Sequence, residues 1–249
     1  MIVTIYQVSR LIYIFLLKAI KTMKTKLFFT GIILLFISCT PSKNSADFIK
    51  KTTGRYFFNA DEIIEVKFND GTLFLTWRNQ NLTPLKINDS TFYVSELNEK
   101  LIFNTSKNNI ALAKKREHKN NTYIFNKLTD GEKTPKEYFN QGDYKAALLG
   151  YKKIKEKDSL NVIIRENTFN RLGYQYIRDN QYKKALAIFK INIELYPNSS
   201  NTYDSTGDAY LKTKDTLKAI EFYKKALAIN PENNSAKRTL TRLIKTKKN

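Results

Sequence analysis

Hydrophobic and polar positions alternate along residues 48–128 in the way expected of short β-strands. Residues 63–68 and 72–77 each have a period of two, and the sequence Asn-Asp-Gly at 69–71 separates them. Asn and Gly tolerate the positive φ of a tight turn, so the two runs are predicted to form a hairpin. Further short runs occur at 85–87, 91–94, 100–103, 109–113 and 122–125. This pattern predicts a small antiparallel β-barrel or sandwich, with Trp77, Phe92 and Phe103 in its core.

Residues 134–246 have a helical period instead, and they contain a repeat. The stretch from Gly173 to Pro197 shares its skeleton of Gly, aromatic, Ala and Pro positions with the stretch from Gly207 to Pro231, 34 positions later. Small residues suit close helix crossings, aromatic residues fill the space between helices, and Pro ends the second helix. The repeat positions are Phe169, Gly173, Tyr176, Ala185, Phe189 and Pro197, then Tyr203, Gly207, Tyr210, Ala219, Tyr223, Ala226 and Pro231.

This skeleton resembles the tetratricopeptide (TPR) repeat, in which each unit is a helix–turn–helix. It predicts a partial unit at 134–159, full units at 166–199 and 200–233, and a capping helix at 234–246. The wider spacing after the partial unit predicts a longer first helix in the next unit. The predicted fold is therefore α+β multidomain: a small β domain at 48–128, a linker at 129–133 and an all-α TPR solenoid from 134.

The N-terminal region, residues 1–38, has the composition of a targeting signal. A basic start is followed by an apolar run from Leu27 to Ser38, which ends at Cys39. The run has the length of a secretory signal, about 7–15 residues, and is shorter than the roughly 20 residues of a bilayer span. Residues 36–39 resemble a bacterial lipobox, which implies cleavage before Cys39 and diacylation of its thiol, with 39–47 as a lipidated tether. The alternative is an uncleaved signal anchor.

Residues 1–22 fit poorly in front of such a signal, because Arg10 and Lys18 interrupt their apolar character. We expect Met23 to be the true start, and a genuine membrane segment is the alternative. Thr40 comes directly after the cysteine, and no acidic residue precedes Asp47. By resemblance to lipoprotein sorting, this predicts an envelope protein on the outer membrane that faces the periplasm.

The formal net charge of +20 favours acidic partners. Lysines are scattered over most of the chain, however, which is typical of a solvated surface. An exported lipoprotein does not meet nucleic acid, so the predicted partners are another envelope protein or peptide and the membrane itself.

The sequence contains little of the chemistry that an enzyme needs. It has no Ser-x-x-Lys pair and no Gly-x-Ser-x-Gly motif, and its one histidine, His118, is predicted to be a surface residue in a loop. Asp61 and Glu62 are adjacent and would face opposite sides of a strand. No metal site or cofactor is predicted, and the chain is expected not to be an enzyme.

Two regions together resemble the segments C-terminal to the catalytic domain in bacterial penicillin-binding-like, β-lactamase-related serine hydrolases. The β half carries this likeness in "GRYFFN" (54–59), "GTLFLTW" (71–77) and "KLIFN" (100–104), and the helical half in "NRLGYQYI" (170–177). The resemblance implies an alternative function, as an accessory or regulatory fragment of such a hydrolase whose catalytic domain is absent or encoded separately.

The resemblance to TPR arrays also implies a binding surface, because helix A of each unit lines a concave groove. The leading prediction is a non-catalytic lipoprotein that binds a protein partner there; the competing interpretation is a solvated spacer. The predicted groove residues are Asn167, Asn170, Tyr174, Arg178, Asn201, Asp204, Asp208 and Lys212. They lack the Lys/Asn/Arg clamp that holds a C-terminal carboxylate in chaperone-binding relatives.

Overall fold

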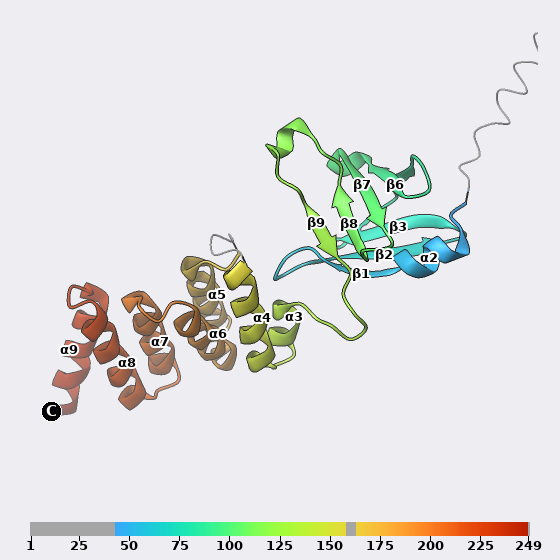
Figure 1. The fold of residues 1–249 in the computed structure, drawn as a ribbon. Helices are drawn as coiled ribbons and strands as arrows, with labels where there is room; N and C mark the ends of the chain where they lie inside the picture. Colours follow the sequence, from blue (N-terminus) through green and yellow to red (C-terminus); the bar gives the residue numbers. More distant parts are fainter. Residues whose placement is uncertain (1–42, 158–162, 249) are drawn as a thin grey trace, which may run out of the picture. The chain divides into compact units, whose positions relative to one another are not determined.

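The computed structural model describes residues 43–157 and 163–248. The predicted signal region, the two candidate start sites and Cys39 lie outside these residues. From Ser45 onward the chain forms one compact unit, in which one short helix and then the strands come before the other helices (Figure 1). Within the described residues, no helix is long and apolar enough to cross a membrane.

The first element of the β domain is a helix, α2 (Ala46–Thr52), so the prediction of strands from residue 48 was wrong at this end. Ser45 caps the helix by accepting a hydrogen bond from the backbone N–H of Phe48 at 3.2 Å. Phe48 and Thr52 are both buried, because residues four apart lie on the same side of a helix. Ala46 and Asp47, which were assigned to the tether, belong to this helix.

Two antiparallel sheets come after α2. The first has the order β1-β2-β3-β4 and the second the order β5-β6-β7-β8-β9. The predicted hairpin is confirmed, since Asn69 pairs with Thr72 and the turn residues Asp70 and Gly71 have φ of 47° and 78°. The strands are β1 (Gly54–Phe57), β2 (Ile63–Asn69), β3 (Thr72–Trp77), β4 (Gln80–Leu82), β5 (Leu85–Lys86), β6 (Thr91–Val94), β7 (Glu99–Asn104), β8 (Asn109–Leu112) and β9 (Ile124–Asn126).

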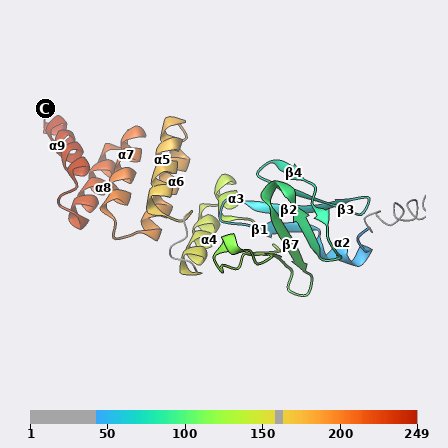
Figure 2. The same ribbon diagram turned by 90° about the horizontal axis from the view of Figure 1, so that it is seen from above.

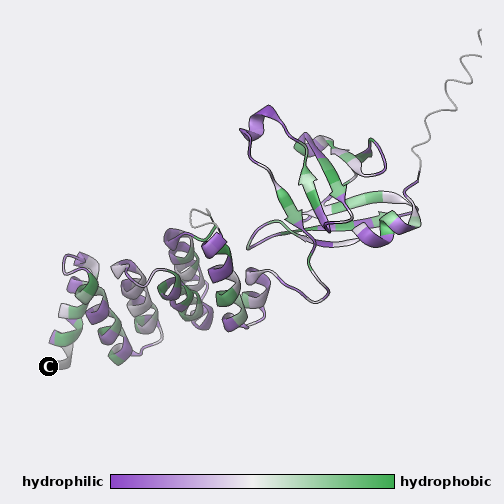
Figure 3. Cartoon of the chain, in the orientation of Figure 1, coloured by the Kyte–Doolittle hydropathy of each residue, from purple (hydrophilic) through white to green (hydrophobic). Residues whose placement is uncertain are grey.

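Both sheets contribute to one hydrophobic core, which Phe48 of α2 joins. Phe92 and Phe103 are 1% and 3% exposed, as predicted, and their ring centroids lie 5.4 Å apart. Trp77 is only partly buried against this core, with the Arg78 guanidinium 4.4 Å from its ring centroid. Hydrophobic residues lie along the strands, and hydrophilic residues concentrate in the turns (Figure 3).

Seven helices come next in the described residues, mostly as antiparallel pairs (Figures 1 and 2). The prediction of a longer helix at the start of the first full unit was wrong, because α5 and α7 both have 13 residues. The wider spacing instead reflects the helix bounds, because α4 ends at Lys157 and α5 begins at Glu166, whereas α6 ends at Leu195 and α7 begins at Ser200. The helices are α3 (Pro135–Asn140), α4 (Tyr144–Lys157), α5 (Glu166–Arg178), α6 (Tyr182–Leu195), α7 (Ser200–Lys212), α8 (Thr216–Ile229) and α9 (Asn234–Lys248).

The two repeat glycines lie where helices cross closely. A Cβ added at Gly173 would lie 2.3 Å from the ring of Phe189, and one at Gly207 would lie 2.8 Å from the ring of Tyr223. Both rings are fully buried. The structure thus confirms why Gly faces an aromatic residue in each unit.

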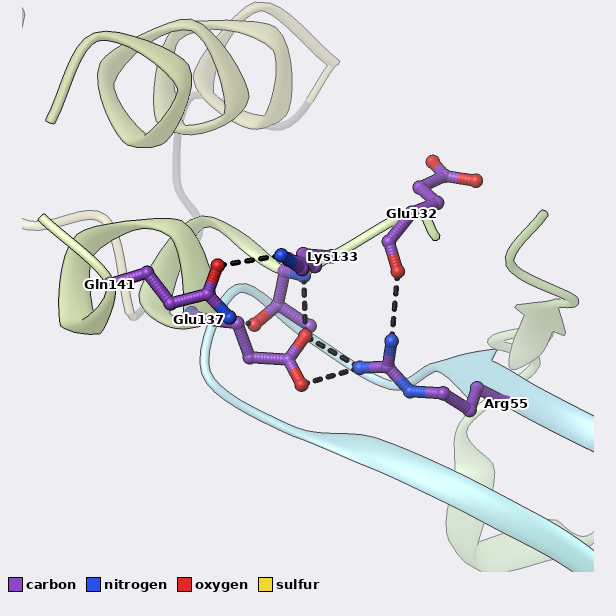
Figure 4. Close-up of polar contacts among 6 residues, drawn as sticks. Arg55, Glu132, Lys133, Glu137 and Gln141 are labelled. Carbon is purple, nitrogen blue, oxygen red and sulfur yellow. Dashed lines mark hydrogen bonds and ion pairs between the residues drawn. The ribbon is translucent and has the colours of Figure 1, made fainter. Parts of the chain in front are cut away.

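The short helix α3 contacts the β domain (Figure 4). Thr134 and Glu137 form a capping box at its start, and Arg55 of β1 donates to both carboxylate oxygens of Glu137. Ala60, in the connection between β1 and β2, belongs to the same hydrophobic cluster as Phe139 of α3. The chain therefore passes from strands to helices through a packed junction.

Candidate partner-binding surface

The predicted groove residues come from α5 and α7, and the structure joins these helices through one carboxylate. The Tyr174 hydroxyl of α5 donates to Asp208 Oδ2 at 2.7 Å, and the Tyr223 hydroxyl of α8 donates to Asp208 Oδ1 at 2.6 Å. Burial, followed by the hydrogen bond to Asp208, raises the pKa of both tyrosines. Both phenols therefore stay protonated donors, and the three residues form a fixed polar network.

Asp204 lies one turn before Asp208 and is only 6% exposed. Burial raises the pKa of its carboxyl to about 6, although a hydrogen bond from Ser235 lowers it and the charge of Asp208 raises it further. Its Oδ1 is buried and accepts no hydrogen bond. Asp204 is thus a supporting residue inside the repeat rather than a side chain presented to solvent.

Asn201 and Asn170 are also held within the repeat array. Asn201 donates to Glu166 Oε1 at 2.8 Å across the α5–α7 contact, and Asn170 Oδ1 is buried without a hydrogen bond. Asn192 of α6 is fully buried and donates to the backbone carbonyl of Glu166 at 3.1 Å. Asn192 occupies the repeat position that Ala226 fills in the next unit, so its amide replaces an apolar contact with a hydrogen bond.

The remaining predicted groove residues, Asn167, Arg178 and Lys212, are exposed. Arg178 and Lys212 occupy corresponding positions in the last turns of α5 and α7. The predicted set therefore divides in two. Five residues mainly stabilise the array, and three exposed donors stand beside them. We call Asn167, Arg178 and Lys212 the helix A donors.

The prediction for His118 was wrong. It ends a short 3₁₀ helix, Arg116–His118, and its side chain is only 10% exposed. Its Nε2 lies 2.9 Å from Glu99 Oε1, and its ring packs edge-on against Tyr123. The partner lies 19 positions earlier in the chain, so the local sequence around His118 carried no signal for this contact.

Asp61 and Glu62 do not act as a carboxylate pair. They lie before β2 rather than in a strand, Glu62 pairs with Arg78 at 3.0 Å, and Asp61 lies 3.6 Å from the ammonium of Lys136. Among the described residues, no group of three or more His, Cys, Asp and Glu side chains is arranged to hold a metal ion. The arrangement of polar groups on α5 and α7 suits hydrogen bonding to a partner chain.

Comparison with known proteins identifies one of the helical units. Residues 201–233 match the family model for the tetratricopeptide repeat. These residues form a TPR repeat. They comprise α7 and α8, and the α5–α6 pair repeats the same residue positions. TPR repeats typically act as protein–protein interaction modules.

Two curated proteins are similar over parts of the chain. The chloroplastic TPR domain-containing protein PYG7 of Arabidopsis thaliana is 30% identical over 69 residues, which is 28% of this chain and 23% of that protein. The uncharacterized protein ycf37 of Pyropia yezoensis is 29% identical over 116 residues, which is 45% of this chain and 63% of that protein. The chain thus spans less than two thirds of either relative.

Solved structures are also similar over the helical part of their length. Residues 41 to the end of MamA from Desulfovibrio magneticus RS-1 are 23% identical, with a TM-score of 0.31; the match covers 46% of this chain and 63% of that one. The TPR domain of Sgt2 from Aspergillus fumigatus is 17% identical, with a TM-score of 0.33. This match covers 46% of this chain and 74% of the Sgt2 chain.

Proposed function

We propose that this chain is a non-catalytic, lipid-anchored envelope protein that binds another protein through the helix A surface of its TPR units. The observation that carries the proposal is the division of that surface. The Tyr174–Asp208–Tyr223 network holds α5, α7 and α8 together, while the helix A donors are exposed on α5 and α7. Donors on a rigid scaffold lose little conformational freedom on binding, so they suit recognition of an extended protein segment.

The donors also indicate which groups of a partner they would contact. Arg178 and Lys212 carry positive charge and only donate hydrogen bonds, and the Asn167 amide both donates and accepts. A segment with exposed carbonyl or carboxylate oxygens fits this set. The β domain, for which a small barrel or sandwich is proposed, would lie between the anchor at Cys39 and the repeats. The hydrolase-fragment alternative is not supported and is not proposed.

The test is capture of a partner by the full chain from the envelope fraction of the native cell. The Arg178→Ala plus Lys212→Ala variant is expected to lose the captured protein. The matched control is Lys190→Ala plus Lys224→Ala, which removes two exposed charges with the same 34-residue spacing from α6 and α8. Equal capture by both double variants would show that the helix A donors are not the binding site.

A further inference from the structure

The outer faces of the two sheets differ in how much apolar surface they expose, because Phe57, Ile63 and Phe74 on the outer face of the first sheet are only partly exposed. In the first sheet, register places one row of outward side chains across all four strands: Arg55, Glu65, Thr76 and Asn81. All four are polar, as expected for a sheet face in contact with water. This row provides an internal standard for the second sheet.

The corresponding row of the second sheet is largely apolar. Thr91 pairs with Ile102, Ile102 with Ala111, and Ala111 with Ile124. Ile87 continues the row beyond β5, because its backbone N–H donates to the Thr91 carbonyl at 2.9 Å. Leu85 pairs with Tyr93 in the adjacent row. We call the face that carries Ile87, Ile102, Ala111, Ile124 and Leu85 the outer apolar face.

The four large apolar side chains of this face are exposed, although those on the inner face of the same strands are not. Leu85 is 62% exposed, Ile87 50% and Ile124 51%. Phe92, Leu101 and Phe125, which alternate with the outer residues, are at most 7% exposed. Single exposed aliphatic residues are ordinary, but a contiguous row across a sheet marks an interaction surface.

The charges around this face are mainly positive. Lys100 lies on the same face beside Tyr93, and Lys107 is exposed in the turn between β7 and β8. The loop between β8 and β9, at the other end of β8, adds exposed Lys114, Arg116 and Lys119. Exposed acidic residues around the face are fewer: Asp89, Glu96 and Glu117. An apolar centre with cations at both ends matches the acyl boundary and anionic head groups of a phospholipid membrane.

The chain length before the domain also favours a membrane. The compact unit that contains the β domain begins at Ser45, six positions after Cys39, so an anchor at Cys39 would hold the β domain within roughly 20 Å of the lipid surface. We propose that the outer apolar face of the second sheet lies against an anionic phospholipid membrane. The reach argument rests on the proposed anchor, whereas the composition of the face does not.

The proposal is tested by measuring the depth of a fluorophore on the full chain in vesicles. The native chain has one cysteine, Cys39, so acylation there leaves a new cysteine as the only label site. An environment-sensitive dye is attached to an Ile124→Cys variant, and the matched control is Lys67→Cys, on an exposed position of the first sheet. The vesicles contain phosphatidylethanolamine and phosphatidylglycerol, with or without brominated acyl chains as the quencher.

We expect a blue shift and loss of fluorescence to the brominated lipid at position 124 but not at position 67. Adding Ile102→Asp should reverse the effect at 124. Equal, unquenched emission at both positions would overturn the proposal. Shielding at 124 without lipid quenching, together with crosslinked dimers, would also overturn it in favour of a second copy.

A separate measurement covers the case in which Cys39 is not acylated. Dye on the unsubstituted chain would mean that Cys39 is free. The dyes at positions 124 and 67 are then measured in a Cys39→Ser background with vesicles added directly. Quenching at position 124 alone supports membrane contact of the outer apolar face, and equal emission at both positions overturns it.

Discussion

Arg55 of β1 and Glu137 of α3 form an ion pair in which one guanidinium nitrogen, Nη2, lies 2.5 Å and 2.6 Å from the two carboxylate oxygens (Figure 4). Arg55 Nη1 also donates to the Glu132 carbonyl at 2.8 Å. Glu137 in turn accepts a hydrogen bond from the Thr134 backbone N–H, so one carboxylate caps α3 and holds it to the sheet. Burial raises the pKa of Glu137, but hydrogen bonds from Thr134 and Arg55 outweigh that effect and lower it overall.

The first prediction concerns this ion pair. Glu137→Gln and Arg55→Ala are each expected to lower the free energy of unfolding, with a coupling of about 1 kcal/mol in a double-mutant cycle, since the side chains are about one third exposed. Because the folded pKa of Glu137 is lowered, its contribution is present above the unfolded value and is lost as pH falls through the folded value. Denaturant unfolding measures both effects.

The control for this pair is Glu221→Gln, which breaks the exposed pair of Lys225 and Glu221 within α8. It should cost at most about 0.5 kcal/mol. A coupling near zero between Arg55 and Glu137 would contradict a packed junction between sheet and helices.

The second prediction concerns the close helix crossing at Gly173. Gly173→Ala is expected to destabilise the protein by about 1–3 kcal/mol, because the new methyl group would overlap the buried ring of Phe189. This loss opposes the gain of about 1 kcal/mol that Ala normally brings to a helix. Gly207→Ala, with a longer approach to Tyr223, should cost less. Thermal unfolding measures the difference.

A smaller side chain at position 189 provides the control for this crossing. In the Gly173→Ala plus Phe189→Leu double variant, the two losses should sum to more than the loss observed, because the smaller side chain leaves room for the methyl group. Stabilisation by Gly173→Ala alone would mean that helix propensity decides at this position and the crossing is not close.

The third prediction concerns the two tyrosines that share Asp208. Asp208→Asn leaves only one accepting oxygen for two hydroxyl donors, so a loss of about 1–3 kcal/mol in the free energy of unfolding is expected. Tyr174→Phe removes one donor and leaves the bond from Tyr223, so it should cost less. Once Tyr174 is replaced by Phe, Asp208→Asn should cost less than in the native chain. Fully additive losses would mean that the three residues do not act together.

The fourth prediction concerns pH and Asp204. Its pKa is about 6 in the folded chain against an ordinary value of 3.8, so the native state binds the proton more tightly than the unfolded state. The stability contributed by this group therefore falls as pH rises from the ordinary value through the folded value. Asp204→Asn, which removes the charge, should raise the free energy of unfolding at about pH 8 by about 1–2 kcal/mol and by less at about pH 5.

Denaturant unfolding of both proteins at both pH values measures this change. Asp179→Asn, at an exposed position after α5, is the matched control and should leave the pH profile unchanged. A gain from Asp204→Asn that is equal at the two pH values would contradict the raised pKa.

The sequence predicted the repeat well because its information is local and periodic. Gly173 and Phe189 belong to one helical pair, and the same pair recurs at Gly207 and Tyr223, so spacing alone identified the crossing. The hairpin at 69–72 was equally local. Contacts between distant segments left no such signal, as the pairs Arg55–Glu137 and His118–Glu99 illustrate.

The groove residues illustrate the same limit. The family pattern selected the helix A positions but gave no information on which of them pack inward. Asp208 became a shared acceptor because Tyr174 and Tyr223 approach it from two other helices. Helix α2 was missed because the alternating strand pattern was taken to start at residue 48, although Phe48 and Thr52, four positions apart, lie on one side of a helix.

The fifth prediction concerns Cys39, the only cysteine of the chain, which lies outside the described residues. If Cys39 is diacylated, its chains suffice for stable membrane attachment, whereas a single chain binds only marginally. Cys39→Ser should therefore release the protein from the membrane fraction or leave it unprocessed. Mass spectrometry of the purified native N-terminus should find a chain that begins at Cys39 and carries lipid. An unmodified Cys39 in a membrane-bound chain that begins at Met1 or Met23 would mean a membrane-spanning anchor. The proposal that this chain is a lipoprotein would then be wrong.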